Sequence, residues 1–259
     1  MSYLDKIFDL NGKVAVITGG GGVLASEIGQ GLAFAGVKIA FVDIHEEAAR
    51  QSAQKIVEAG GEAIGLRTNV LDMDELKATR EKVLERYGMV DILLNAAGGN
   101  LPGATIAPDE SIFNINLDDL NKVTELNYNG SVFPSLVFGE LMAGQRSGSI
   151  INISSMAALR TITRVWGYSA AKAAVTAFTR CLYTELRPHG IAVGLLVPGG
   201  SNTGFQDAAA GAETFEWDEA WAVRPEHFAD MVYQWCALSQ GASVSELVLY
   251  GIAQDVAGY

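Results

Sequence analysis

A short apolar run followed at once by four glycines is the feature that most limits how this chain can fold. Residues 13–18 read Lys-Val-Ala-Val-Ile-Thr, residues 19–22 are all glycine, and residues 23–35 have helical character. A short, continuously apolar run is typical of a parallel strand that is buried on both faces. The stretch therefore predicts a strand, a tight turn and a helix in direct succession.

Strand and helix patterns continue to alternate along the rest of the chain. Six further strands are expected at residues 37–43, 62–68, 90–95, 149–154, 191–197 and 245–250. Five further helices are expected at residues 46–59, 72–87 (with Asp72 as its cap), 117–142, 168–186 and 225–238. Alternating strands and helices build a parallel sheet with helices on both faces, whose ligands bind beyond the carboxyl ends of the strands. We therefore predict one α/β domain over residues 1–259, with a doubly wound, seven-stranded parallel sheet.

The glycine turn suits a dinucleotide. Glycines let the backbone approach a pyrophosphate, and the following helix offers free N–H groups and the positive end of its dipole. The expected contacts are Gly19, Gly22, Val23 and Leu24. A flexible turn without a ligand is the alternative interpretation.

Asp43 ends the second strand, about 20 residues after the glycines, where an acid can accept both hydroxyls of the adenosine ribose. Residues 44–46, Ile-His-Glu, offer no Arg or Lys to a 2′-phosphate. The expected cofactor is therefore NAD rather than NADP. A helix N-cap is the alternative role for Asp43.

Tyr168 and Lys172 are four residues apart in an expected helix, so they share one face. A free Tyr has a pKa of about 10, and bringing it near 7 costs about 4 kcal/mol. One cation about 4 Å away supplies roughly that much at an effective dielectric constant of about 20. The pair is a candidate acid/base, although a packed Tyr beside a solvated Lys is the alternative.

Composition excludes several classes of partner. The net charge is −12, which disfavours nucleic acid, because phosphate contacts need clustered Lys and Arg. No apolar stretch reaches about 20 residues, so no membrane span is expected. The first residues show no basic segment followed by an apolar run, which favours a cytoplasmic protein. Cys181 and Cys236 form no CxxC motif and are expected to be buried, reduced thiols, and the three His residues have no metal-ligand spacing.

Further motifs follow one another in a familiar order. They are Thr18-Gly19 with the glycine tract, Asn69-Val70, Asn95-Ala96-Ala97-Gly98, Asn127, Ser155, Tyr168-Ser169-Ala170-Ala171-Lys172, and Pro198-Gly199 with Thr203. Each motif is common by itself, but together and at these intervals they are specific. The chain resembles the short-chain dehydrogenase/reductase family over nearly its full length, which implies a Rossmann-type sheet and a homodimer or homotetramer.

The resemblance also implies catalytic roles. Tyr168 would exchange a proton with the oxygen of a small-molecule substrate, and Lys172 would lower the pKa of Tyr168 and bind the nicotinamide ribose. Ser155 would hydrogen-bond the substrate oxygen, and Asn127 would anchor a water relay behind Lys172. Hydride transfer itself belongs to the cofactor.

The resemblance implies cofactor contacts as well. Asn69 would meet the adenine, Asn95 and Ala96 the adenosine ribose side, and Thr203 the carboxamide. The neighbouring motif residues Val70, Ala97, Gly98, Pro198 and Gly199 complete the expected cofactor site. The chain departs from the family at Val23, where glycine is usual and where a side chain would narrow the turn.

Two regions, residues 18–25 and 95–105, are similar to family members of the D-mannonate/fructuronate oxidoreductase type, which act on sugar acids. Asn100, within the second region and at the start of a long loop, is a candidate substrate contact. Arg160 or Arg164 would bind a substrate carboxylate, since an Arg fork suits that group. A surface or subunit-interface role for these Arg residues is the alternative.

Residues 200–224 are expected to form a lid over the substrate. Its aromatic residues Phe215, Trp217 and Trp221 suggest an apolar wall, which suits a less polar hydroxy compound better than a sugar acid. Glu216 or Asp218 could instead supply a second acid/base for epimerisation or dehydration. A nucleotide-binding protein that has lost turnover is the alternative from another functional class.

Overall fold

The computed structural model describes residues 9–107, 109–160, 162–203, 221–238 and 242–254. Their seven strands form one sheet in the order β3-β2-β1-β4-β5-β6-β7, and every neighbouring pair is parallel. The strands are β1 Val14–Thr18, β2 Lys38–Asp43, β3 Ala63–Arg67, β4 Ile92–Asn95, β5 Gly148–Ile153, β6 Ile191–Pro198 and β7 Glu246–Leu249. The predicted seven-stranded parallel sheet is confirmed.

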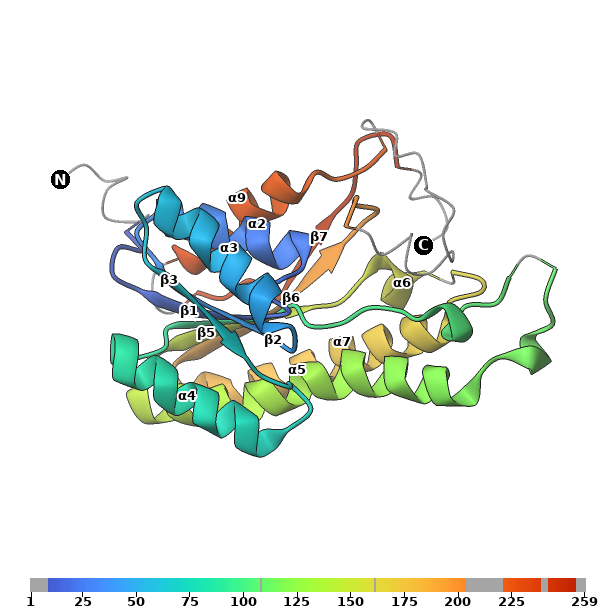
Figure 1. Cartoon of the computed structure of the whole chain (residues 1–259), viewed down its shortest axis with the longest axis horizontal. Coiled ribbons are helices and arrows are strands. Elements are labelled where there is room, and N and C mark those ends of the chain that lie inside the picture. Colours follow the sequence, from blue (N-terminus) through green and yellow to red (C-terminus); the bar gives the residue numbers. More distant parts are fainter. Residues whose placement is uncertain (1–8, 108, 161, 204–220, 239–241, 255–259) are drawn as a thin grey trace.

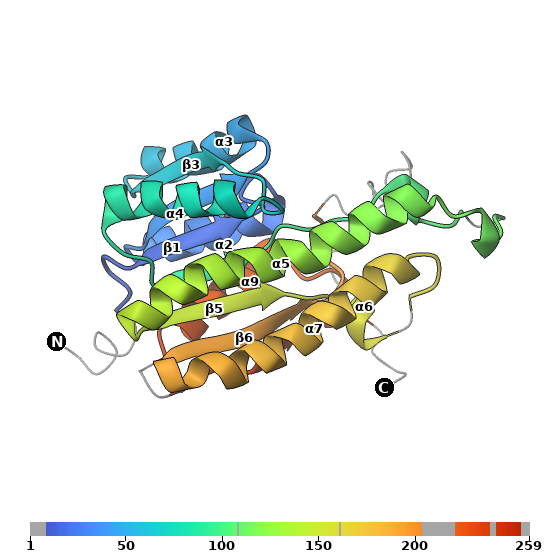
Figure 2. The same ribbon diagram turned by 90° about the horizontal axis from the view of Figure 1, so that it is seen from below.

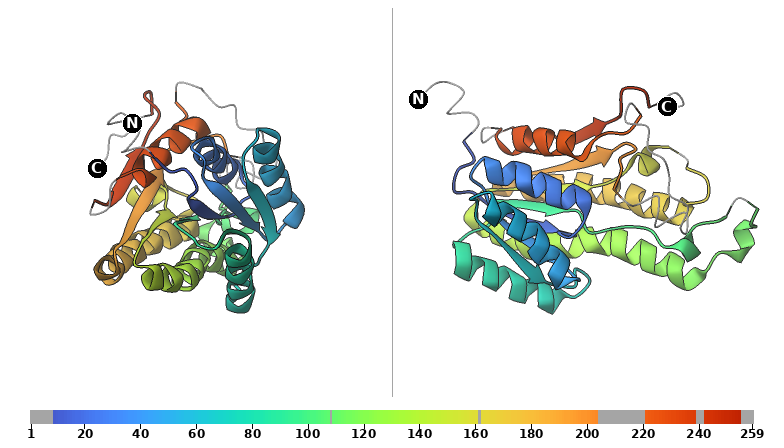
Figure 3. Two further views of the ribbon diagram at one scale, coloured as in Figure 1. Left: turned by 90° about the vertical axis from the view of Figure 1, so that its left-hand side faces the viewer. Right: turned by 45° about the horizontal axis from the view of Figure 1, so that its top comes forward.

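Helices cover both faces of the sheet, as Figures 1 and 3 show. On one face lie α2 Val23–Phe34, α3 Glu46–Glu58 and α9 Pro225–Cys236; on the other lie α4 Met73–Tyr87, α5 Leu117–Gln145 and α7 Trp166–Leu186. Shorter pieces are α6 Met156–Leu159 and the 3-10 turns η1 Pro102–Ala104, η2 Ile112–Asn114 and η3 Arg187–His189. The arrangement is the doubly wound sheet that the alternating pattern predicts.

The core consists of two layers, one on each face of the sheet. In β1, Ala15 and Ile17 belong to the layer beneath α2, α3 and α9. Val14 and Val16 belong to the layer beneath α4, α5 and α7. All four side chains are at most 1% exposed. Burial on both faces is the reason why the first four positions of the strand, residues 14–17, are all apolar.

The first turn of α7 begins earlier than the sequence pattern predicts. The helix starts at Trp166 rather than at Tyr168, and it therefore includes Gly167. Glycine is unfavourable inside a helix by about 1 kcal/mol relative to alanine. A Cβ at Gly167 would collide with the Leu120 side chain of α5. Close packing between α5 and α7 therefore explains the glycine.

Side-chain caps define where two helices begin. The Asp72 carboxylate accepts hydrogen bonds from the N–H groups of Asp74 (2.9 Å) and Glu75 (3.0 Å), which confirms the predicted cap of α4. Asn116 caps α5 in the same way, accepting from Asp118 (3.0 Å) and Asp119 (3.1 Å). Such caps satisfy N–H groups that have no partner within the helix.

The expectation that both cysteines are buried is wrong for Cys181, which is exposed, whereas Cys236 is partly buried. Val175 and Leu182 carry the buried side of α7, so Cys181 falls on its outer side. Among the described residues, no three His, Cys, Asp or Glu side chains gather as a possible metal site. Within the same ranges, no helix combines the length and hydropathy needed to span a bilayer.

The order of the strands reverses at the carboxyl ends of β1 and β4. The chain builds outward from β1 through β2 to β3, and then returns to β4 on the other side of β1. The carboxyl ends of β1 and β4 therefore border the point where the direction of winding reverses, which is where such folds bind ligands. The beginning of α5 extends beyond this edge, as Figure 2 shows.

Candidate active site

The chain leaves β1 in a turn that requires glycine at its first position. Gly19 has a φ of 64°, and a Cβ on this residue would lie 2.8 Å from the Cα atom of Ala97 and 2.9 Å from the carbonyl oxygen of Ala96. The N–H of Gly22 donates to the carbonyl oxygen of Gly19 across 2.9 Å and closes the turn. Positive φ and close backbone contact both exclude a side chain at position 19.

The N-terminus of α2 is prepared for an anion. Gly22 occupies the cap position without a side-chain hydrogen bond, and the first turn contains no acidic residue. The first N–H groups of a helix, here those of Val23, Leu24 and Ala25, have no acceptor within it. The side chain of Val23 is 48% exposed, so it is not packed into the turn. The backbone therefore fits a pyrophosphate at this position.

Asp43 connects the end of β2 to the glycine turn. Its Oδ2 atom accepts a hydrogen bond from the N–H of Gly21 (3.0 Å), and its Oδ1 atom accepts from the N–H of His45 (2.9 Å). His45, not Asp43, is the N-cap residue of α3. The carboxylate thus lies beside the turn, where it fits the hydroxyls of an adenosine ribose.

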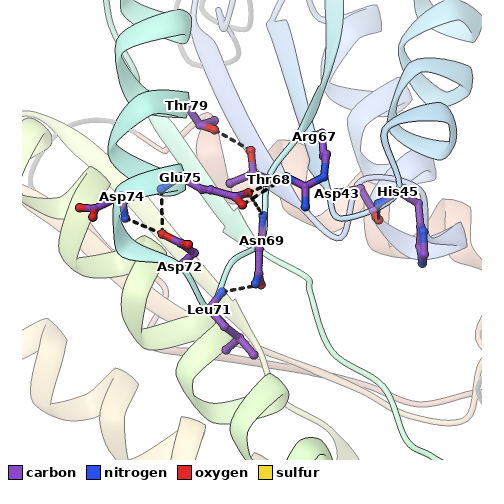
Figure 4. A network of polar contacts seen from close by, with 10 residues as sticks. All are labelled: Asp43, His45, Arg67, Thr68, Asn69, Leu71, Asp72, Asp74, Glu75 and Thr79. Atoms are coloured by element: carbon purple, nitrogen blue, oxygen red, sulfur yellow. Dashed lines mark hydrogen bonds and ion pairs between the residues drawn. The ribbon is translucent and has the colours of Figure 1, made fainter.

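The end of β3 is held by a polar network, drawn in Figure 4. The N–H of Asn69 donates to Oε2 of Glu75 (2.8 Å), and the Oδ1 atom of Asn69 accepts from the N–H of Leu71 (3.0 Å). Val70 is buried, and its Cγ2 atom lies against Gly130 of α5. The Nδ2 group is therefore the part of the Asn69 side chain that can meet an adenine.

The side chain of Asn95 points into the core rather than beyond the sheet. Its Nδ2 group donates to Oγ of Ser135 (2.9 Å) on α5 and to Oδ1 of Asn152 (2.8 Å) on β5. The Nδ2 group of Asn152 in turn donates to Oγ1 of Thr179 (3.0 Å) on α7. These bonds tie two helices to the sheet, so Asn95 would meet a cofactor through its backbone.

The segment after β4 is anchored to the end of β1. The hydroxyl oxygen of Thr18 accepts hydrogen bonds from the N–H groups of Ala96 (3.1 Å) and Ala97 (3.2 Å). Thr18 is fully buried. The two strand ends that border the reversal of winding are therefore joined by one hydroxyl group.

Tyr168, Lys172 and Ser155 come together at the carboxyl end of β5. The Nζ atom of Lys172 lies 5.7 Å from the centre of the Tyr168 ring and donates to the carbonyl oxygen of Ile153 (2.9 Å). A hydrogen bond joins the side chains of Tyr168 and Ser155. The Ser155 hydroxyl also caps α6, where it accepts from the N–H of Ala157 (3.1 Å). The predicted acid/base pair and its serine therefore form one cluster.

Asn127 holds the segment after β4 against α5. Its Nδ2 group donates to the carbonyl oxygens of Gly99 (2.7 Å) and Val123 (2.8 Å), and its Oδ1 atom accepts from the N–H of Gly99 (3.2 Å). A Cβ at Gly98 would lie 2.6 Å from Oδ1 of Asn127 and 3.2 Å from Nζ of Lys172. The absence of a side chain at Gly98 therefore lets the backbone approach both Asn127 and Lys172.

Burial dominates the electrostatics of the pair. Burial raises the pKa of Tyr168 to about 12, although the hydrogen bond with Ser155 opposes the rise. Burial lowers the pKa of Lys172 to about 8. The expectation that Lys172 lowers the pKa of Tyr168 is therefore not met in the chain alone. The ammonium faces the ring and bonds to a backbone carbonyl, while the phenol lies in a poorly solvated environment.

The end of β6 is closely packed. Pro198 is the last residue of the strand, and the N–H of Gly199 donates to the carbonyl oxygen of Leu249 (2.7 Å) at the end of β7. Thr203 is partly exposed and follows Gly199 after three residues. These three predicted cofactor residues thus lie at or after the carboxyl end of β6, a strand that lies between β5 and β7 in the sheet.

The expected lid lies largely outside the described residues, which include 200–203 and 221–224 from this segment. The ring of Trp221 packs against Gly200. Four residues with predicted roles in the lid fall outside the described ranges: Phe215, Glu216, Trp217 and Asp218.

The loop after β4 packs beside Tyr168. Leu101 and Ala104 share a small apolar cluster with Tyr168 and Ala157. Asn100, which precedes this contact, is 6% exposed. The loop therefore forms one side of the candidate substrate space.

Asn100 itself presents an incompletely satisfied amide. Its Nδ2 group donates to Oγ1 of Thr105 (2.7 Å), and the Thr105 hydroxyl donates to the carbonyl oxygen of Leu101 (3.3 Å). The Oδ1 atom of Asn100 is buried and has no hydrogen-bond partner among the described residues. A buried acceptor without a partner is unusual in a native protein and calls for an explanation.

The two candidate Arg residues differ in exposure. Arg160 is the C-cap residue of α6 and is partly buried, whereas Arg164 is exposed and has a φ of 76°. The carbonyl oxygen of Arg164 accepts a hydrogen bond from the N–H of Ile106 (3.0 Å), which joins this segment to the loop after β4. Because the side chain of Arg164 is exposed and that of Arg160 is partly buried, Arg160 is the better candidate for a substrate contact.

Sequence reasoning missed two residues near the adenosine end of the site. Glu75 accepts from the N–H of Asn69 and pairs with Arg67, with an Nη1–Oε2 distance of 3.1 Å. The signal was present, since Glu75 lies three residues after the capping Asp72, as in a capping box. Here the carboxylate reaches further back, to the end of β3.

Comparison with known proteins agrees with this geometry. A family model described as short chain dehydrogenase matches residues 13–213. An uncharacterized oxidoreductase from Haemophilus influenzae is 39% identical over 201 residues, which are 74% of this chain and 70% of the relative. The uncharacterized oxidoreductase UxuB from Bacillus subtilis is 36% identical over 199 residues, which are 74% of this chain and 72% of the relative.

A solved structure extends the similarity to nearly the whole chain. It is the crystal structure of a candidate D-mannonate oxidoreductase from Haemophilus influenzae with bound NAD, with a TM-score of 0.84 and 30% identity. The match covers 95% of this chain and 96% of that one. The chain therefore belongs to the short chain dehydrogenase family.

Proposed function

We propose that this chain is an NAD(H)-dependent oxidoreductase that interconverts a secondary alcohol and a ketone, with Tyr168 as general acid/base. One observation carries the proposal: Tyr168, Ser155 and Lys172 form a single cluster beside the edge where the sheet reverses its winding. A binding protein without turnover would have no need for this cluster. NADH oxidation with a ketone substrate tests the proposal, and cofactor binding without turnover on a broad panel would favour the alternative.

NAD fits the residues at the adenosine end of the site. The free N–H groups at the start of α2 suit its pyrophosphate, and Asp43 suits its ribose hydroxyls. The similar Haemophilus influenzae protein was crystallised with NAD. When bound, the nicotinamide supplies or accepts the hydride. Tyr168 and Lys172 would border its ribose, and Thr203 its carboxamide.

The side chains of the cluster divide the remaining work. Tyr168, protonated at neutral pH because its pKa is about 12, is ready to donate a proton to a carbonyl oxygen. Ser155 orients the same oxygen through its hydroxyl. Lys172 holds a positive charge near the phenol, which would stabilise the phenolate that remains after proton transfer. Asn127 positions the neighbouring backbone and would anchor a water relay.

We propose a sugar acid or polyol as the substrate. The Oδ1 atom of Asn100 is a buried acceptor that a substrate hydroxyl would satisfy. Arg160, and less directly Arg164, would bind a carboxylate. A less polar hydroxy compound is the second candidate substrate, because the aromatic residues Phe215 and Trp217 suggest that the proposed lid, residues 200–224, is apolar.

Replacing Asn100 with Leu should distinguish hydroxylated substrates from matched deoxy analogues. We expect kcat/KM for the hydroxylated substrate to fall by about tenfold or more, because a hydrogen bond between uncharged groups contributes about 0.5–1.5 kcal/mol and an unpaired buried group costs more. For the analogue that lacks the hydroxyl, kcat/KM should stay nearly constant. Thr105→Val serves as a control, because it removes the acceptor of the Asn100 Nδ2 group and leaves the Oδ1 atom in place. An equal loss for both substrates would contradict a direct contact.

A substrate panel with NADH should identify the substrate class. Uronates and ketoses are compared with aryl and alkyl ketones, and the expected result is faster turnover of the sugar acids. In the same assay, Arg160→Ala should raise KM for a sugar acid by about tenfold. A loss of that size corresponds to one charge-assisted hydrogen bond of about 1.5 kcal/mol. If both Arg160→Ala and Arg164→Ala leave this KM unchanged, the carboxylate contact is ruled out.

We also propose a cytoplasmic homodimer or homotetramer that pairs through the outer faces of α5 and α7. These two helices lie side by side on one face of the sheet (Figure 2). The exposed Leu136 on α5 supports an apolar contact there. Light scattering on the purified chain distinguishes a monomer from a dimer or tetramer.

A further inference from the structure

The side chain of Arg67 leaves β3 on the same face of the sheet as the side chain of Asp43 leaves β2. The two residues are direct neighbours in the parallel pairing of β3 with β2. Side chains of paired residues in adjacent strands point to the same face. The backbone therefore directs a cation toward the carboxylate that we assign to the adenosine ribose.

The guanidinium group of Arg67 nevertheless bonds to a residue of α4, the helix that follows β3. Its Nη1 atom bonds both carboxylate oxygens of Glu75 in the first turn of α4, at 3.2 Å and 3.1 Å. Helix α4 covers the opposite face of the sheet from α3, and Figure 4 shows Arg67 between Asp43 and Glu75. Near the end of the strand, the Arg67 side chain therefore has its partner on a helix of the opposite layer.

Glu75 is itself firmly held. Its Oε2 atom accepts from the N–H of Asn69, the residue expected to meet the adenine, across 2.8 Å. This backbone hydrogen bond and the bond with Arg67 lower the pKa of Glu75 below its usual value. Glu75 therefore stays charged at neutral pH and holds Arg67 in a defined place.

The position of this ion pair matters for the charge near the ribose. A 2′-phosphate would meet the negative charge of Asp43, and an unrestrained Arg67 could offset that repulsion. With Glu75 beside it, Arg67 carries a neutralising partner and its guanidinium is bonded to that carboxylate. Asp43, Arg67 and Glu75 together carry one negative charge.

We propose that Glu75 is a positioning residue for cofactor choice: it withholds the Arg67 guanidinium from the 2′-position of a dinucleotide bound at Asp43 and so favours NAD over NADP. The inference rests on the proposed function, because it requires that the chain bind a dinucleotide at this site. It adds two residues, Glu75 and Arg67, to the selectivity expected from Asp43.

Cofactor affinities measured without substrate test the proposal. NADH and NADPH fluorescence titrations give both dissociation constants for wild type, Glu75→Gln, Asp43→Asn and the double variant. Glu75→Gln keeps an acceptor for Asn69 but removes the charge. We expect Glu75→Gln to improve the affinity for NADPH relative to NADH by about threefold. This is the expected effect of removing one screened charge within about 10 Å of the 2′-phosphate. The double variant should improve it by at least the product of the single effects.

Dependence on Arg67 and on salt separates positioning from a structural effect. Adding Arg67→Met to Glu75→Gln should remove the gain of that variant, and raising the salt concentration should reduce it. Asp74→Asn is the matched control, because it removes a charge from the adjacent, exposed residue, which pairs with Lys77 instead. Equal effects of Glu75→Gln and Asp74→Asn, or a gain that survives Arg67→Met, would overturn the inference while leaving the proposed function intact. If wild type binds neither cofactor, the proposed function itself fails and the inference fails with it.

Discussion

Replacing Tyr168 with Phe is expected to lower kcat by about 10³-fold, within the usual range for loss of a general acid/base. The substitution removes one oxygen atom, the one that hydrogen-bonds Ser155. The ring, its packing against Leu101 and Ala104, and the nearby Lys172 all remain. The dissociation constant for NADH should therefore change little, so the loss should appear in kcat.

A matched control is available on the same helix. Tyr183 lies on α7, is partly buried and packs beside the core layer under α5. Tyr183→Phe removes the same atom away from the site and should leave kcat within about twofold, since it touches no group that takes part in proton transfer. Thermal unfolding of both variants checks that the fold is intact. Turnover of Tyr168→Phe at more than a tenth of the wild-type rate would exclude Tyr168 as the acid/base.

Replacing Lys172 with Met is expected to abolish most activity and yet to stabilise the fold at pH 7. Loss of a charge that stabilises a developing anion typically lowers kcat by about 10²–10³-fold. Stability changes in the opposite direction because the ammonium is buried: its pKa is lowered from 10.5 to about 8. That shift corresponds to about 3 kcal/mol at pH 7, of which the lost bond to the carbonyl of Ile153 offsets about 1–2 kcal/mol. The net gain in unfolding free energy should be about 1–2 kcal/mol.

The sign of the pH dependence follows from linkage. Between pH 8 and 10.5 the native wild-type protein has released the Lys172 proton while the unfolded chain still holds it. The unfolded state then binds more protons, so wild-type stability rises with pH. The advantage of Lys172→Met should therefore shrink from pH 7 to pH 9.5. Tyr168 affects stability at higher pH. Because its pKa is raised in the native state, its contribution to the free energy of unfolding is present below pH 10 and is lost as the pH rises toward 12.

Denaturant unfolding at pH 7 and pH 9.5 measures this effect. Lys77→Met, at an exposed position on α4, is the control, and it should show no comparable change with pH. A Lys172→Met variant that is less stable than wild type by the same amount at both pH values would show that the buried charge is not the cause.

Much of the architecture follows from local patterns in the sequence. Burial on both faces makes the central strands predominantly apolar, and the intervening helices carry their own periodicity. The seven strands and their order along the chain can therefore be predicted from the sequence. The need for glycine at position 19 follows from a tight turn, and the four-residue spacing of Tyr168 and Lys172 follows from the helix. These properties depend on neighbours that are close in sequence.

Contacts between distant segments decided the rest. The core-facing side chain of Asn95, the early start of α7 at Trp166 and the pairing of Arg67 with Glu75 each depend on residues brought together by packing. The electrostatics of Tyr168 and Lys172 differ from the expectation for the same reason. Spacing along a helix shows that a phenol and an ammonium are near each other, but only the surrounding structure determines how much water is excluded from both. By itself the sequence determined the parallel sheet and the residues gathered at its carboxyl edge, and the tertiary structure decided their directions, partners and protonation, because desolvation depends on atoms that are remote in the chain.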